Sequence, residues 1–80
     1  MAQTPVPLSL KEHLELASEL RASGARLRVL CDLVTSVYGP DSRPAFSFAR
    51  AAEALDRLRH DMQSQATVDL PDGKVDHLYF

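Results

Sequence analysis

A cysteine and a histidine could form a catalytic pair in this 80-residue chain, but their spacing does not favour it. A cysteine nucleophile needs a base within hydrogen-bonding reach. His13 and Cys31 fall on one predicted helix, where a rise of 1.5 Å per residue separates them by roughly 27 Å. We therefore expect His13 to be a partly buried, hydrogen-bonded residue near a helix end. We expect Cys31 to be a small structural thiol among apolar neighbours.

Carboxylates recur at helical spacing in two places, in one of them with a histidine, as a metal site in a helical bundle would require. Metal sites in bundles combine Glu-x-x-His motifs that project inward. In this chain Glu53, Asp56 and His60 have a different spacing, and they lie away from the apolar stripe of their helix. The second group lies on a charged face of the first helix and comprises Glu12, Glu15 and Glu19. We predict no metal site and no catalytic residue, and we expect these side chains to be solvated.

Arginine side chains could contact phosphate groups, but acidic neighbours match them. Arg50, Arg57 and Arg59 are interleaved with a set of carboxylates, which are Glu53, Asp56 and Asp61. The chain has no glycine-rich phosphate loop and no zinc-ligand spacing, so we expect no cofactor. The net charge of −2 falls entirely on residues 67–80, since residues 1–66 are neutral in sum. Such a charge distribution suits a phosphate backbone poorly, and we do not expect nucleic acid as a partner.

The composition places the chain in a reducing compartment. The single cysteine allows no internal disulfide bond, and no run of residues is apolar enough to cross a membrane. Residues 1–7 lack the features of a signal peptide. We therefore expect a cytoplasmic protein, and the excess of arginine over lysine favours a bacterial source with a GC-rich genome.

Two helices are predicted, with a clear break between them. Ser9 and Glu12 have the spacing of a capping box, which begins a first helix over about 10–38. Glycine and proline in 39–44 end that helix. A second helix follows over about 45–66, with a narrow apolar stripe. Because short connections place consecutive helices side by side, we predict an antiparallel helical hairpin.

Gly24 leaves the continuity of the first helix open. Glycine costs about 1 kcal/mol inside a helix and often ends one. However, no polar loop follows Gly24, and the next residues favour helix. We prefer an unbroken helix. A break would instead give three helices followed by a β-hairpin, which is the order of a winged helix.

The last segment, 67–80, is predicted to form a short β-hairpin. Two stretches with β-branched residues flank a turn sequence at 71–74, which has proline early and glycine late. We assign 1–8 to an irregular arm, 9–66 to the helical hairpin and 67–80 to the same domain. Two interpretations of the tail stay open. Its end could dock a protein partner through Leu78, Tyr79 and Phe80, or it could fold back and thicken a thin core.

The first helix carries more apolar surface than the second helix can cover. An apolar seam runs along it with a spacing near 3.5 residues, and its self-association residues are Leu16, Leu20, Leu27, Leu30, Val34 and Val37. Domains this small usually need a disulfide, a metal or a partner subunit. We therefore predict a mainly α protein that homodimerises into a four-helix bundle. The function that follows is a non-catalytic interaction or adaptor module, and the alternative is a winged-helix nucleic-acid-binding regulator.

Overall fold

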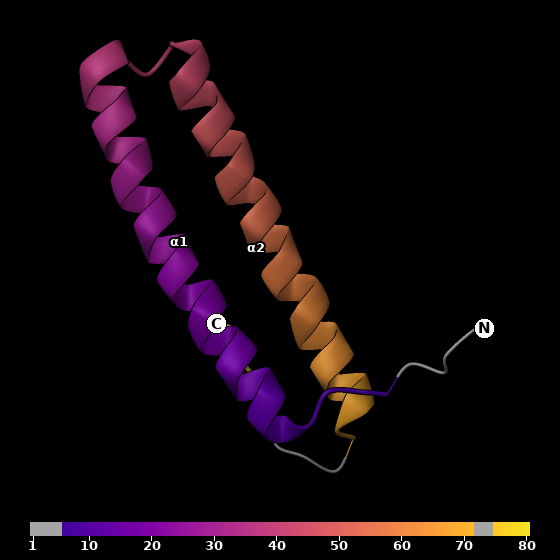
Figure 1. Ribbon diagram of the computed structural model, residues 1–80. Coiled ribbons are helices and arrows are strands. Elements are labelled where there is room, and N and C mark those ends of the chain that lie inside the picture. The colour runs from indigo at the N-terminus through magenta and orange to yellow at the C-terminus, as the bar shows by residue number, and fades with distance from the viewer. Residues whose placement is uncertain (1–5, 72–74) are drawn as a thin grey trace, which may run out of the picture.

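The computed structural model describes residues 6–71 and 75–80, and it consists of two long helices that lie side by side (Figure 1). Helix α1 spans Leu10–Tyr38 and helix α2 spans Arg43–Asp69. The two run antiparallel and are joined by a short turn, which confirms the predicted helical hairpin. The bounds of α1 are as predicted, whereas α2 is longer at both ends than the predicted 45–66.

Side-chain caps explain where each helix begins. The Ser9 hydroxyl accepts a hydrogen bond from the Glu12 backbone N–H at 3.2 Å, and the Glu12 carboxylate accepts one from the Ser9 N–H at 3.0 Å. The Ser42 hydroxyl accepts from the Ala45 N–H at 3.3 Å and donates to the Gly39 carbonyl at 2.8 Å. These bonds satisfy backbone groups that have no partner within the helix.

Gly39 ends α1 in a backbone conformation that other residues rarely adopt. Its φ is +93°, and its N–H donates to the Thr35 carbonyl at 2.8 Å. An L-residue with a side chain is strained at such an angle, so glycine is required here. The chain then turns and enters α2 with Pro44 in the first turn, where its missing N–H costs nothing.

Gly24 lies inside an unbroken α1, as preferred from the sequence. A Cβ atom built at Gly24 would lie 3.4 Å from a Leu55 methyl carbon and 3.7 Å from a guanidinium nitrogen of Arg59. These are ordinary van der Waals distances, so Gly24 is a point of close approach between the helices. Since α1 is not divided here, the three-helix order on which the winged-helix alternative depends is not present.

The predicted C-terminal β-hairpin is wrong for the part of the chain that the structure describes, which contains no strand. Thr67–Asp69 continue α2, and the Thr67 hydroxyl donates to the Gln63 carbonyl one turn earlier at 3.1 Å. The helix ends at Leu70 because the proline that follows disfavours helical angles in the residue before it. Residues 75–80 form turns instead, with an N–H···O bond from Leu78 to Val75 at 3.2 Å. Of the predicted turn at 71–74, residues 72–74 lie outside the described residues.

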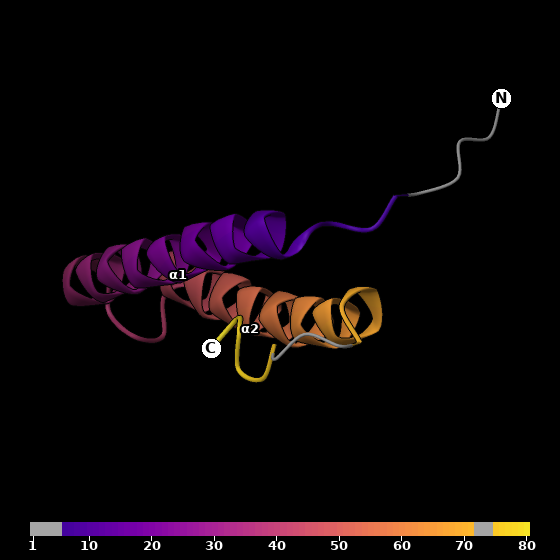
Figure 2. The same cartoon turned by 90° about the horizontal axis from the view of Figure 1, so that it is seen from below.

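The core is concentrated at the open end of the hairpin, where the tail returns. Fully or nearly buried residues are few and mostly small, and they comprise His13, Ala17, Ala45, Ala66, Val75 and Tyr79. Figure 2 shows the two helices as one layer with the tail, in yellow, on one side of it only. The tail therefore covers part of one side of the two-helix layer. On the other side, the described residues leave the helix surface uncovered. Neither helix, over the described residues, has the length and apolarity needed to cross a membrane.

The helical conformation of Gly24 predicts that Gly24→Ala stabilises the protein. Alanine reduces the freedom of the unfolded chain, and its methyl group fits against Leu55 without a clash. The expected gain in the free energy of unfolding is about 0.5–1 kcal/mol. The midpoint of urea unfolding measures it.

Gly39→Ala is the matched control, because the same change is made where φ is positive. It should lower the urea midpoint, since alanine is strained there by roughly 1 kcal/mol or more. If both variants were destabilised, Gly24 would not lie in regular, uncrowded helix.

Candidate functional site

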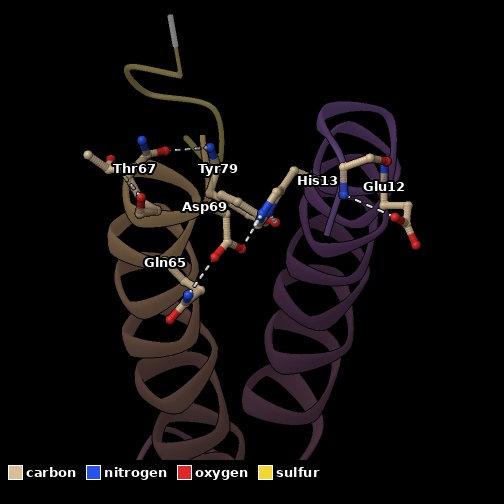
Figure 3. A network of polar contacts seen from close by, with 8 residues as sticks. Glu12, His13, Gln65, Thr67, Asp69 and Tyr79 are labelled. Carbon is tan, nitrogen blue, oxygen red and sulfur yellow. Dashed lines mark hydrogen bonds and ion pairs between the residues drawn. The ribbon is translucent and has the colours of Figure 1, made fainter. Parts of the chain in front are cut away.

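A buried polar cluster joins both helices to the tail. Figure 3 shows His13 of α1 between Asp69, at the end of α2, and Tyr79 of the tail. The His13 Nε2 lies 2.9 Å from a carboxylate oxygen of Asp69, and Nδ1 lies 2.7 Å from the Tyr79 hydroxyl oxygen. His13 and Tyr79 are completely buried. The prediction that His13 is a hydrogen-bonded residue near a helix end is confirmed, and its burial is complete.

The hydrogen-bond donors and acceptors of the cluster match when the imidazole is neutral. The pKa of Asp69 is lowered because Gln65 and then His13 hydrogen-bond to its carboxylate, so this group is ionised and can only accept. With Nε2–H donating to Asp69, Nδ1 of the neutral ring can accept the hydrogen bond that the Tyr79 hydroxyl donates. Burial, with the nearby charge of Asp69, raises the pKa of Tyr79 and keeps the phenol protonated. Every polar atom of the three side chains that is buried thus has a partner.

Further hydrogen bonds hold the backbone of the tail against the helices. The amide of Gln63 donates to the Val75 carbonyl and accepts from the Tyr79 N–H at 3.0 Å. Arg21 of α1 donates to the Leu78 carbonyl at 3.0 Å. The backbone of the tail is therefore bonded to α1 through Leu78 and to α2 through Val75 and Tyr79.

The three residues predicted to dock a partner lie in different environments. Tyr79 is buried, Leu78 is half-buried against the core cluster, and Phe80 is 44% exposed. The Phe80 ring lies 5.2 Å from the Arg59 guanidinium carbon and 4.7 Å from the His60 ring. The exposure that motivated a docking role is thus found at Phe80 and is absent at Tyr79. Docking of a partner by this segment stays a prediction.

Of the six residues predicted for self-association, five are half-buried along α1 and one is exposed. Leu16 and Leu20 pack against the core cluster at the open end and are only half-buried. Leu27, Leu30 and Val34 are also half-buried. Val37, near the turn, is 62% exposed. The intramolecular contact with α2 therefore covers this set incompletely.

The side of α1 that carries Leu30, Val34 and Val37 faces away from the tail. Arg21, which binds the Leu78 carbonyl, marks the tail side of α1. At about 100° per residue, Leu30 lies about 180° from Arg21 around the helix, and Val37 about 160°. On α2, Leu58 is likewise about 160° from His60, which contacts Phe80. We call this bare side the uncovered face, and its apolar residues are Leu30, Leu33, Val34, Val37 and Leu58.

Cys31 lies in a groove between the helices, on the side toward the tail. The groove has a volume of about 540 Å³. Cys31 is half-buried beside Leu27, and Arg21, Arg59 and other charged residues line the same groove. His13 is not among its lining residues, so the structure does not bring the cysteine and the histidine together.

The predicted charged groups lie on exposed surface except Arg59, whose side chain is only 26% exposed. His60 is 3.8 Å from Asp56, and both side chains are more than half exposed. Arg59 pairs with the same Asp56 at 3.4 Å. Within residues 6–71 and 75–80, no group of three His, Cys, Asp or Glu side chains is arranged to hold a metal ion.

The partners of His13 were not predictable from the sequence. Asp69 and Tyr79 are distant from it along the chain, and both were assigned to a β-hairpin. One signal did exist, because His13 falls on the apolar side of α1, where a histidine needs hydrogen-bonding partners. The sequence did not indicate which residues would provide them.

The polar cluster predicts that Tyr79→Phe destabilises the fold. The change removes one hydroxyl and leaves the buried Nδ1 of His13 without a donor, which costs about 1–3 kcal/mol. In a domain of this size that lowers the thermal midpoint by at least ~4 °C. Tyr38→Phe, at a 66% exposed tyrosine, is the matched control and should leave the midpoint nearly unchanged. Equal midpoints for the two variants would show that the Tyr79 hydroxyl stabilises nothing.

The same cluster predicts that both acid and alkali weaken the attachment of the tail. The lowered pKa of Asp69 gives stabilisation that is present above the ordinary value of 3.8 and is lost as the pH falls through the lower folded value. The raised pKa of Tyr79 gives stabilisation that is present below 10.0 and is lost as the pH rises through the higher folded value.

Absorbance titration of the Tyr38→Phe protein isolates Tyr79, because the chain has two tyrosines. Its pKa should be higher in the native protein than in the same protein unfolded in urea. Identical values in the two states would contradict the burial of this hydroxyl against Asp69.

No protein-family model, curated protein or solved structure matches this chain. The function must therefore be inferred from its own residues and their geometry.

Proposed function

We propose that this protein is a non-catalytic interaction module that acts as a homodimer, in which the uncovered faces of two copies pack together into a four-helix bundle. The observation that carries the proposal is the uncovered face itself. Leu33 and Val37 of α1 are 58% and 62% exposed, and Leu58 of α2 is 43% exposed. Next to them lie Leu30 and Val34, which α2 covers only in part.

The thinness of the core supports the same conclusion. Apart from His13 and Tyr79, the side chains buried completely or nearly so are small, and three of them are alanines. A chain of about 80 residues that lacks a disulfide has few other ways to bury enough apolar surface. A second copy supplies a matching helical layer, since a two-fold dimer pairs the same patch on both subunits.

An adaptor role agrees with the chemistry of the described residues. His13, whose two ring nitrogens are both hydrogen-bonded, is buried between Asp69 and Tyr79 and has no exposed atom. The exposed charges are of mixed sign, which disfavours binding to a nucleic-acid backbone. We propose that the homodimer acts in the cytoplasm and that a further protein partner docks at the C-terminal segment, where Phe80 remains accessible.

Light scattering at micromolar concentration tests the proposal. The expected mass is that of two chains. Leu30→Asp should shift the mass toward one chain, because an unpaired charge in an apolar contact costs several kcal/mol and each 1.4 kcal/mol is a tenfold loss in affinity. The dimer dissociation constant should rise by roughly 100-fold or more.

Two further variants keep this test interpretable. Val37→Asp also lies in the uncovered face but at an exposed position, so it should weaken the dimer while the helical circular dichroism is retained. Phe46→Asp introduces the same charge at a residue that is 63% exposed and lies about 120° around α2 from Leu58. It should leave the mass at two chains. A mass of one chain for the unmodified protein would end the proposal.

A further inference from the structure

The uncovered face of α1 carries charges as well as apolar residues, and they lie on both sides of Ser23. Leu16 and Leu30 lie at equal distances along the helix from Ser23. Between them, on the same side of the helix, Glu19 precedes Ser23 and Arg26 follows it. At 100° per residue, all five positions fall within about 80° of one another around the helix.

Glu19 and Arg26 have no partner within their own chain among the described residues. Both are exposed, and neither belongs to an ion pair of α1 or α2. They cannot pair with each other, because two turns of helix separate them by roughly 10 Å. Each charge is therefore free to meet a charge on a second molecule.

The direction of packing follows from the charge distribution. The first half of this side of α1 is acidic, with Glu12, Glu15 and Glu19, whereas the second half has Arg26 and then apolar residues. Parallel packing of two α1 helices would place the acidic halves together. Antiparallel packing places each acidic half against the half that contains Arg26, and it also opposes the two helix dipoles.

We propose that the two copies meet through antiparallel α1 helices, with the two-fold axis close to Ser23. This inference rests on the homodimer of the proposed function and specifies its register. The part of Leu16 that the core leaves exposed packs against Leu30 of the other copy, and Glu19 pairs with Arg26 of the other copy, twice. Ser23 is small, so the helices approach closely at the axis. Glu19 and Arg26 lie about 6 Å and 4.5 Å from Ser23 along the helix, a mismatch that the long arginine side chain spans.

Charge reversal tests this register, with the dimer dissociation constant from sedimentation as the measurement. Glu19→Arg alone and Arg26→Glu alone each replace two attractive pairs by two repulsive ones. Each should raise the dissociation constant by roughly tenfold or more. The double variant restores opposite charges with their places exchanged, and its dissociation constant should return to within about threefold of the unmodified protein.

Arg28→Glu is the matched control. It changes the net charge as much as Arg26→Glu does, but it lies about 160° away around α1, toward the tail. It should leave the dissociation constant unchanged. Circular dichroism of each variant should keep its helical signal, because all three residues are exposed on the helix surface.

The outcomes separate the register from the dimer itself. If neither single reversal changed the dissociation constant, the antiparallel register would be overturned. In parallel packing each residue faces its own copy, so a charge reversal only replaces one pair of like charges with another. A double variant that is no tighter than the single variants would reject the pairing of Glu19 with Arg26. In both cases the homodimer would stand. If the unmodified protein were a monomer, the proposed function and this inference would fail together.

Discussion

The imidazole of His13 is the point at which the three segments of the protein meet. It bonds to Asp69 at the end of α2 and to Tyr79 of the tail, and it is itself buried in α1. Because a buried imidazole needs partners for both nitrogens, this one residue holds the end of α2 and the returning tail against α1. The tail in turn supplies Tyr79, the largest side chain that is completely buried.

The position of this cluster leaves the molecule asymmetric. The tail crosses one side of the two-helix layer near its open end and does not reach the other side (Figure 2). Two helices can each bury only one stripe against the other, and α1 has a second stripe that includes Leu30 and Val37. Among the described residues that stripe is covered only in part, and a second layer of helices is the ordinary way in which proteins cover such a surface.

The sequence was sufficient to predict what depends on neighbouring residues. The capping box of Ser9 and Glu12, the glycine end of α1 at Gly39 and the continuity of the helix through Gly24 are all local, and the structure confirms them. The β-hairpin was wrong because β-branched residues at Thr67 and Val68 indicated a strand, whereas bonds to the preceding turn of α2 retain them in the helix. The contact of His13 with Tyr79 could not be predicted, since it joins opposite ends of the chain. The uncovered face was predicted in outline, and only the structure shows that Val37 is exposed while Leu16 and Leu20 serve the core.

The central claim is that the fold of one chain is completed by a second copy, and the concentration dependence of unfolding tests it most directly. For a dimer that unfolds to two separate chains, each tenfold rise in protein concentration stabilises the folded state by about 1.4 kcal/mol. The urea midpoint should therefore rise steadily as the concentration is raised from the micromolar to the millimolar range. A midpoint that stays the same over that range would show that one chain folds alone, and it would contradict the account.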